Sequence, residues 1–194
     1  SRGLGDVYKR QGIVQRVMGK NVSVNLGKAD GILSENEQVK GEEFEPTERI
    51  KVYILEVKDT PKGPRILLSR THPGLVKRLF ESEVAEVKDG TVEIKSIARE
   101  AGSRTKIAVW SNDPDVDPVG ACVGMNGARV NSIVEELRGE KIDIINWDEN
   151  PAILIENALS PAKVIAVMAD PDEKTALVAV SYTHLRAHET SQDL

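Results

Sequence analysis

Gly124–Gly127, a turn with glycine at both ends, lies between two predicted helices and constrains the fold more than any other stretch. Asp117 is a favourable N-cap and Pro118 suits the first helical position, so a short helix is expected to begin there and to end at the turn. A second helix is predicted after the turn by apolar residues spaced i, i+3, i+4 and i+7, namely Val130, Ile133, Val134 and Leu137. Glycines let the backbone approach a sugar-phosphate chain, and the N–H groups at the start of the second helix favour an anion. The sequence therefore predicts a phosphate-facing turn between two helices.

The strands predicted around this helix pair indicate a particular kind of domain. Gly90–Ile97 and Lys106–Trp110 precede the pair and Lys141–Trp147 follows it, each with a strand-like composition. The order strand, strand, helix, GxxG, helix, strand resembles that of a type II KH domain, whose loop clamps about four nucleotides of single-stranded RNA or DNA. With a further helix predicted at about Pro73–Ser82, this domain is expected to cover residues 73–147.

Four stretches of this predicted KH domain resemble one particular family more closely. They are Lys95–Glu100, Arg104–Val109, Asp117–Gly124 and Gly139–Ile144. Together they resemble the first KH domain of the NusA family of bacterial transcription termination/antitermination proteins. The resemblance implies a non-catalytic transcription elongation, termination and antitermination factor that binds single-stranded nascent RNA. It also implies RNA polymerase and other antitermination factors as partners, although the family's amino-terminal polymerase-binding domain is expected to be absent here.

Before this domain, a series of five short strands without a helix predicts a small barrel. The predicted segments are Gly12–Val17, Asn21–Leu26, Gly27–Leu33 (a turn and a short strand), Arg49–Val57 and Arg65–Ser69. Such a series is typical of an OB-fold, and its residues resemble the S1-type barrel that precedes the KH domains in the NusA family, here covering residues 12–72. The first strand is expected to be truncated, which leaves one barrel edge unpaired. Ser34–Thr47 is rich in glutamate and is predicted to be a solvated loop.

After the KH domain, residues 148–179 are predicted to repeat its first elements, a helix followed by two strands. A helix to about Leu159 and strands at Val164–Met168 and Ala176–Ala179 are predicted, and Asn157–Ala162 resembles the start of the second KH domain of the NusA family.

The two ends, residues 1–11 and 180–194, match translations of the two strands of a transposase sequencing adaptor and are predicted to be non-native tails. The predicted fold class is therefore α+β and multi-domain: a five-stranded OB-type (S1) β-barrel, a type II KH domain with a three-stranded sheet, and an incomplete second KH domain.

The predicted nucleic-acid contacts centre on the turn. Gly124 and Gly127 allow close backbone approach, while Met125 and Asn126 are expected to line the clamp. Phosphate is expected to be neutralised by three cations, Arg129, Arg104 and Lys106, and an apolar floor for the bases is expected from Val123 and Ile107. Basic and aromatic side chains often bind single strands on the exposed face of such barrels. On this barrel they are predicted to be Lys51, Tyr53 and Arg70.

Composition and missing motifs narrow the function classes. The net charge of −5 argues against bulk coating of nucleic acid but leaves room for a local basic face. Cys122 is the only cysteine, so an intrachain disulfide is impossible and a cytoplasmic location is expected. The sequence shows no apolar run that could span a membrane, no Walker motif, no Gly-x-Ser-x-Gly and no zinc pattern. Catalysis, a cofactor, a metal site, a membrane partner and a small-molecule substrate are therefore not expected.

Two alternatives remain open. A phosphorolytic exoribonuclease also carries KH and S1 modules, but in that family the KH module precedes the S1 module, whereas here the barrel comes first. A ribosome-associated KH protein is the second alternative, and it is distinguished by binding only an assembled particle rather than free single-stranded RNA.

Overall fold

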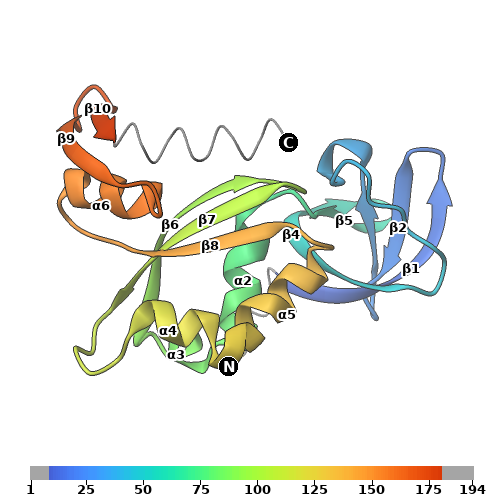
Figure 1. Ribbon diagram of the computed structural model, residues 1–194. Helices are drawn as coiled ribbons and strands as arrows, with labels where there is room; N and C mark the ends of the chain where they lie inside the picture. Colours follow the sequence, from blue (N-terminus) through green and yellow to red (C-terminus); the bar gives the residue numbers. More distant parts are fainter. Residues whose placement is uncertain (1–8, 181–194) are drawn as a thin grey trace, which may run out of the picture.

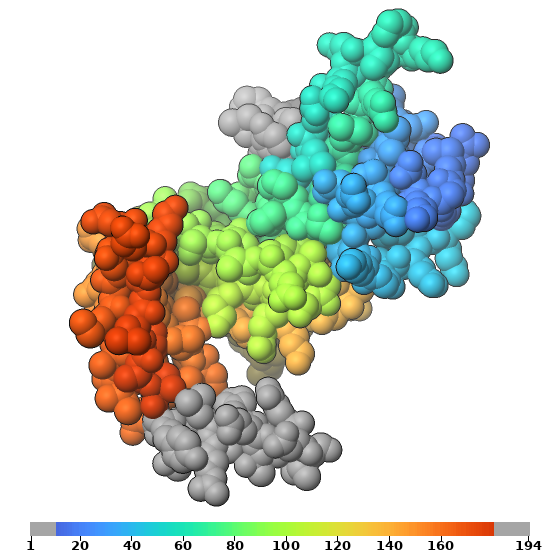
Figure 2. Space-filling model, turned by 90° about the horizontal axis from the view of Figure 1, so that it is seen from above, coloured from blue at the N-terminus to red at the C-terminus, as the bar shows by residue number. Residues whose placement is uncertain are grey.

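Three units follow one another along residues 9–180, the part of the chain that this computed structural model describes (Figure 1). They are a barrel (residues 9–72), a KH domain (residues 73–147) and a terminal unit (residues 148–180). Figure 2 shows the blue-to-cyan barrel and the orange-to-red terminal unit on opposite sides of the green part of the KH domain. Of the predicted tails, 1–11 and 180–194, residues 1–8 and 181–194 lie outside the described residues, while Val180 ends a strand.

The barrel is closed. Its strands are β1 (Lys9–Met18), β2 (Asn21–Asn25), β3 (Asp30–Leu33), β4 (Arg49–Thr60) and β5 (Gly63–Ser69), in the order β1-β2-β3-β5-β4. Pairs are antiparallel except β3 with β5, which is parallel. Buried side chains from every strand fill the interior, namely Val14, Val22, Val24, Leu33, Ile50, Val52 and Leu68. This confirms the five-stranded OB-type prediction.

Two predictions about the barrel are wrong. The expected unpaired edge does not exist, because β1 pairs with both β2 and β4 and its register with β4 runs from Lys9 opposite Tyr53 to Ile13 opposite Arg49. Residues 9–11, predicted to belong to a tail, are therefore part of this strand. The segment 34–47 is not a fully solvated loop, since it holds the short 3₁₀ helix η1 (Glu35–Glu37) and buries Val39 and Phe44.

The KH domain has helices on one face of a three-stranded sheet (Figure 1). Its elements are α2 (Pro73–Glu83), α3 (Ala85–Lys88), β6 (Val92–Glu100), β7 (Arg104–Ser111), α4 (Pro118–Val123), η2 (Met125–Gly127), α5 (Ala128–Glu136) and β8 (Lys141–Asn146). The sheet order is β6-β7-β8, with β6 and β7 antiparallel and β7 and β8 parallel. The predicted element order and the helix start at Pro118 are confirmed.

The core of the KH domain follows from periodicity. Apolar side chains on one face of α2, which include Leu75, Leu79 and Phe80, pack against Ile107 and Val109 of β7. Because strand side chains alternate between faces, Lys106 and Ala108 project to the other side of the sheet. The face of the sheet that carries the helices is thus apolar, and the opposite face carries charged residues.

Two arginines join the barrel to the KH domain. The Arg70 side chain, 1% exposed, donates to the Glu42 carboxylate at 2.7 Å and to the backbone carbonyl of Glu136, at the end of α5, at 3.1 Å. Arg138, one residue beyond α5's C-cap, pairs with Glu48 at 2.7 Å. The C-terminal end of α5 is therefore fastened to the barrel.

The terminal unit contains α6 (Pro151–Leu159) and a hairpin of β9 (Val164–Asp170) and β10 (Thr175–Val180). These elements confirm the predicted helix and two strands. α6 lies on the sheet face opposite the other helices (Figure 1), where the Lys106 ammonium donates to the carbonyl of Ala158. The hairpin leaves Ile165, Met168 and Leu177 each 71% exposed.

Candidate nucleic-acid interface

The GxxG turn has a backbone that requires its glycines. Gly124 and Gly127 have φ angles of 77° and 76°, and Asn126 between them is also left-handed at 54°. A Cβ added to Gly124 would lie 2.8 Å from Cγ of Arg129, well inside contact distance. Met125 is 85% exposed at the tip of the turn. The turn therefore presents bare backbone and one flexible apolar side chain to solvent, as the sequence predicts for a clamp.

The start of α5 follows directly on the turn. Gly127 occupies the N-cap position of this nine-residue helix and offers no capping side chain, while the first helical N–H, that of Ala128, donates to the Met125 carbonyl. Backbone N–H groups at a helix N-terminus attract phosphate through their hydrogen bonds and the helix dipole. Glycine at the cap also leaves no Cβ between these groups and a ligand.

The edge of the sheet lies beside the turn. Within the described residues, β8 is the last strand of the order β6-β7-β8 and pairs only with β7, and both α4 and α5 contact it. Its outer backbone edge thus faces solvent next to the helix pair.

The three predicted phosphate-binding cations do not lie together. Arg104 and Lys106 alternate with core-facing Thr105 and Ile107, so they project from the sheet face away from the turn. The Arg104 side chain is 58% exposed and pairs with Asp143 at 3.1 Å. Arg129 adjoins the turn, but its guanidinium is bound to Glu86 and to a backbone carbonyl. Arg104 is the most exposed of the three.

Two predicted contacts are wrong because their side chains are buried. Ile107 is 0% exposed and belongs to the KH core, so it forms no floor for bases. Arg70 is 1% exposed and its charge is paired inside the barrel–KH junction. Val123, at the end of α4, is only half-buried and keeps a partly open surface beside the turn.

The remaining predicted barrel residues also lie at the junction. The Tyr53 ring stacks on His72, with ring centroids 4.5 Å apart and planes 5° apart, and packs against the KH core. The Lys51 backbone N–H donates to the Glu136 carboxylate at 3.0 Å. Lys51 and Tyr53 are half-buried, so part of each side chain remains accessible.

Sequence reasoning missed the acidic partners of these arginines. Glu86 pairs with Arg129 across 43 residues, and Glu136 contacts Arg70 across 66. The sequence contains no signal for such pairs, because neither lies within one helical turn or one hairpin of its partner. The GxxG motif could be recognised from the sequence, whereas the ion pairs formed by residues distant in the sequence could not.

Two titrating groups of the KH domain have shifted pKa values. Burial in the first place, with a smaller contribution from the Glu86 carboxylate and against the effect of Arg129, raises the pKa of the Cys122 thiol to about 11, so this thiol stays protonated at neutral pH. Burial disfavours the charged form of Glu140, but hydrogen bonds from Arg99, Thr105 and the Gly102 N–H outweigh it and hold the pKa of Glu140 below its ordinary value.

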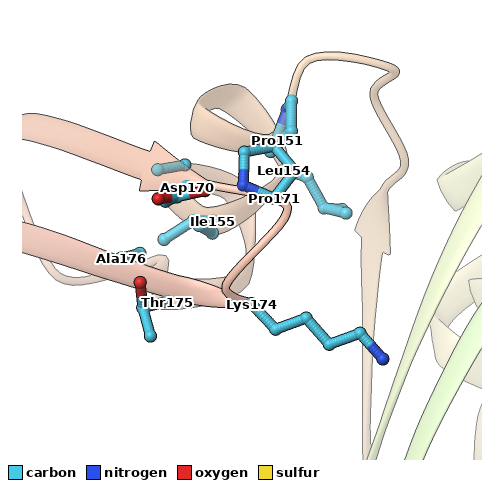
Figure 3. A pocket seen from close by; sticks show the side chains of 9 residues that line it. Pro151, Leu154, Ile155, Asp170, Pro171, Lys174, Thr175 and Ala176 are labelled. Atoms are coloured by element: carbon cyan, nitrogen blue, oxygen red, sulfur yellow. The ribbon is translucent and has the colours of Figure 1, made fainter.

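Among the described residues, the other features that could carry function would be a metal site, a membrane-spanning helix or a ligand pocket. They contain no group of three or more His, Cys, Asp or Glu side chains that could hold a metal ion, and none of their helices is long and apolar enough to cross a membrane. A shallow pocket of about 320 Å³ lies in the terminal unit, between Pro151 and Leu154 of α6 and the β9–β10 turn (Figure 3). Its lining is largely apolar and belongs to a different unit from the GxxG turn.

Comparison with known proteins finds similarity to one family. Residues 70–147 match the family described as the NusA-like first KH domain. The chain is 58% identical over 169 residues to the transcription termination/antitermination protein NusA of Bacillus subtilis, covering 87% of this chain and 46% of that protein. The chain is thus similar to NusA proteins over most of its length, and its residues 70–147 match their first KH domain.

Other NusA proteins are similar over the same share of the chain. The protein of Thermus thermophilus is 47% identical over 171 residues, covering 88% of this chain and 44% of its own length. That of Mycobacterium tuberculosis is 46% identical over 178 residues, covering 87% and 51%. The chain thus spans about half the length of the NusA proteins that it matches.

A solved multidomain protein with nucleic acid binding domains from Streptococcus pneumoniae is a more distant structural neighbour. It aligns with a TM-score of 0.30 and 10% sequence identity, covering 88% of this chain and 46% of that one. This similarity is too low to establish a shared fold.

Proposed function

We propose that this chain binds single-stranded nascent RNA through its GxxG turn, as the RNA-gripping part of a bacterial transcription elongation, termination and antitermination factor. It catalyses no reaction. The curated relatives are named for transcription termination and antitermination. RNA polymerase and other antitermination factors are the proposed protein partners, and the cytoplasm is the proposed location.

The observation that carries the proposal is the backbone of the turn. Gly124 and Gly127 hold left-handed angles, Met125 projects into solvent and no side chain caps α5. A single strand can therefore lie against bare backbone and place a phosphate near the first turn of α5, where the N–H groups after that of Ala128 have no side-chain cap. Met125 and Asn126 line this contact, Val123 offers a partly open apolar surface, and Arg104 supplies charge farther along the sheet.

The barrel is proposed to extend the same surface. Lys51 and the stacked Tyr53–His72 pair lie where the barrel meets the KH domain. An aromatic ring beside a cation is a common platform for an unpaired base.

The test is fluorescence anisotropy with labelled single-stranded and duplex RNA. We expect the double variant Met125→Asp, Asn126→Asp to bind single-stranded RNA at least about tenfold more weakly, which corresponds to ~1.4 kcal/mol. Aspartate places negative charge where phosphate lies, and it adopts the left-handed conformation at position 126 as asparagine does. The glycine pair variant Gly124→Asp, Gly127→Asp is expected to lose binding more completely, since it also adds a Cβ beside Arg129.

A matched control adds the same charge elsewhere. Gly27 and Gly90 also have positive φ angles, of 99° and 88°, and a Cβ at either position meets nothing within 4 Å. The variant Gly27→Asp, Gly90→Asp is expected to keep single-strand binding within about twofold, a margin that corresponds to ~0.4 kcal/mol. Equal loss in this control and in the turn variants, or no loss in either, would contradict the proposed site.

A further inference from the structure

Arg129 is bound by the protein's own acceptors. Its Nη1 donates to the carbonyl of Ala121 at 2.8 Å and to the Glu86 carboxylate at 2.9 Å. Ala121 lies in the last turn of α4, where carbonyl groups lack the N–H of a following turn. The guanidinium therefore acts as a C-terminal cap for α4, in the manner expected of a basic side chain at this end of a helix.

The stem of the same side chain packs against the turn. A Cβ placed on Gly124 would lie 2.8 Å from Cγ and 3.0 Å from Cβ of Arg129, so this stem fills the space beside Gly124. Arg129 thus contacts three segments at once: α3 through Glu86, α4 through Ala121, and the turn through Gly124. Since Arg129 itself lies in the first turn of α5, it joins the two helices that the GxxG turn connects.

The charge of Arg129 is compensated where it lies. The Arg129 and Glu86 side chains are 35% and 34% exposed and form a single ion pair. At distances beyond a few ångströms the two opposite charges largely cancel, which weakens the attraction of Arg129 for a phosphate. Moving the guanidinium to RNA would also leave the Ala121 carbonyl and the Glu86 carboxylate without this donor.

We infer that Arg129, held by Glu86, is a positioning residue that fastens α4 to α5 around the GxxG turn, and that it is not a phosphate ligand. This inference rests on the proposed function for its effect on RNA. The affinity for RNA then depends on Arg129 and Glu86 through the shape of the turn. Phosphate is held by the turn backbone and by cations other than Arg129.

The experiment measures single-strand binding across a salt series, well below the unfolding temperature, for Glu86→Ala, Glu86→Gln and Arg129→Met. We expect Glu86→Ala to weaken binding about threefold to tenfold, since Arg129 loses its anchor; this factor corresponds to ~0.7–1.4 kcal/mol. Glu86→Gln keeps an acceptor oxygen and is expected to stay within about twofold of wild type, or ~0.4 kcal/mol. Arg129→Met is expected to weaken binding as well, and the double variant Glu86→Ala, Arg129→Met is expected to be no weaker than Arg129→Met alone.

The salt dependence separates a brace from a ligand. A cation that contacts phosphate contributes about 0.7 to the slope of log K against log salt for a single strand, so losing it lowers the slope by that amount. We expect Arg129→Met to leave the slope unchanged. Tighter binding by both Glu86 variants, together with a slope reduced by about 0.7 in Arg129→Met, would overturn the inference and make Arg129 a phosphate ligand restrained by Glu86.

Two controls separate the inference from the proposed function. Glu135→Ala removes an exposed carboxylate from α5 and reports the effect of charge alone, so it is expected not to weaken binding. Amide hydrogen exchange of Gly124 and Gly127, whose N–H groups are bonded to Gly120 and Gly124, tests the brace without RNA. If wild type binds no single-stranded RNA the proposed function fails, whereas unchanged exchange at these two amides in Glu86→Ala and Arg129→Met would overturn the brace.

Discussion

The barrel–KH junction offers a quantitative test of how the two units are held together. Arg70→Met keeps most of the side-chain length but removes every donor. In the native protein those donors contact the Glu42 carboxylate at 2.7 to 3.1 Å, the Lys51 carbonyl at 2.7 Å and the Glu136 carbonyl at 3.1 Å. Nη1 of Arg70 also lies 3.5 Å from the Glu136 carboxylate. The variant therefore leaves two carboxylates and two carbonyls without their arginine donor, at a site where Arg70 is 1% exposed.

The loss of stability in Arg70→Met depends on which buried groups lose their ion-pair or hydrogen-bond partner. Breaking a buried ion pair by removing one member costs about 3–5 kcal/mol, mainly because the other charge stays buried without compensation. Glu42 keeps a second cation, since Nε of Arg138 lies 3.4 Å from its carboxylate. The loss should therefore fall at the lower end, at about 3 kcal/mol of the free energy of unfolding.

Urea unfolding followed by far-ultraviolet circular dichroism measures this loss. With a slope of about 2 kcal/mol per molar urea, a loss of about 3 kcal/mol lowers the midpoint by ~1.5 M. Arg65→Met is the matched control, because Arg65 is exposed on β5, and it should change stability by less than about 0.5 kcal/mol. A loss below about 1 kcal/mol for Arg70→Met, or one equal to that of the control, would refute the assignment of Arg70 as the junction's buried anchor.

Two further predictions concern titrating groups. Because the folded pKa of Glu140 lies below its ordinary value of 4.5, the stability from its ionised form is complete above that value and is lost as pH falls through the folded pKa. Glu140→Gln should therefore lower stability most at neutral pH, with a difference from wild type that shrinks below pH 4.5; a difference independent of pH in urea titrations would contradict this. Since burial raises the pKa of the Cys122 thiol to about 11, a disulfide reagent at pH 8 should label it only as fast as the protein opens, and labelling at the rate of the unfolded chain would contradict its burial.

Local patterns in the sequence predicted most of the secondary structure. The helix start at Pro118, the turn at Gly124–Gly127 and the helix after it each depend on residues within two turns of one another. The barrel strands follow from alternation, as at Val22 and Val24. Short-range sterics and periodic burial act over these same distances, which is why the sequence shows them directly.

The site residues were harder to place, for different reasons. Ile107 alternates with Lys106 along β7, so only one of the two could face any given surface, and packing against α2 decided that Ile107 is core. The outer end of β1 was missed because residues 9–11 show no amphipathic pattern, yet they pair with β4 through backbone groups, which every sequence carries.

The sequence by itself determined the GxxG turn: two glycines with positive φ, a helix that begins directly after them and an exposed residue between them. Tertiary structure decided what each arginine does. Arg70 became a buried anchor because Glu42 and Glu136 meet it from 28 and 66 residues away, and Arg129 became a brace because Glu86 lies beside it. A guanidinium has the same chemistry in all these places, and only the long-range packing of the chain sets whether its partner is a carboxylate of the protein or a phosphate of RNA.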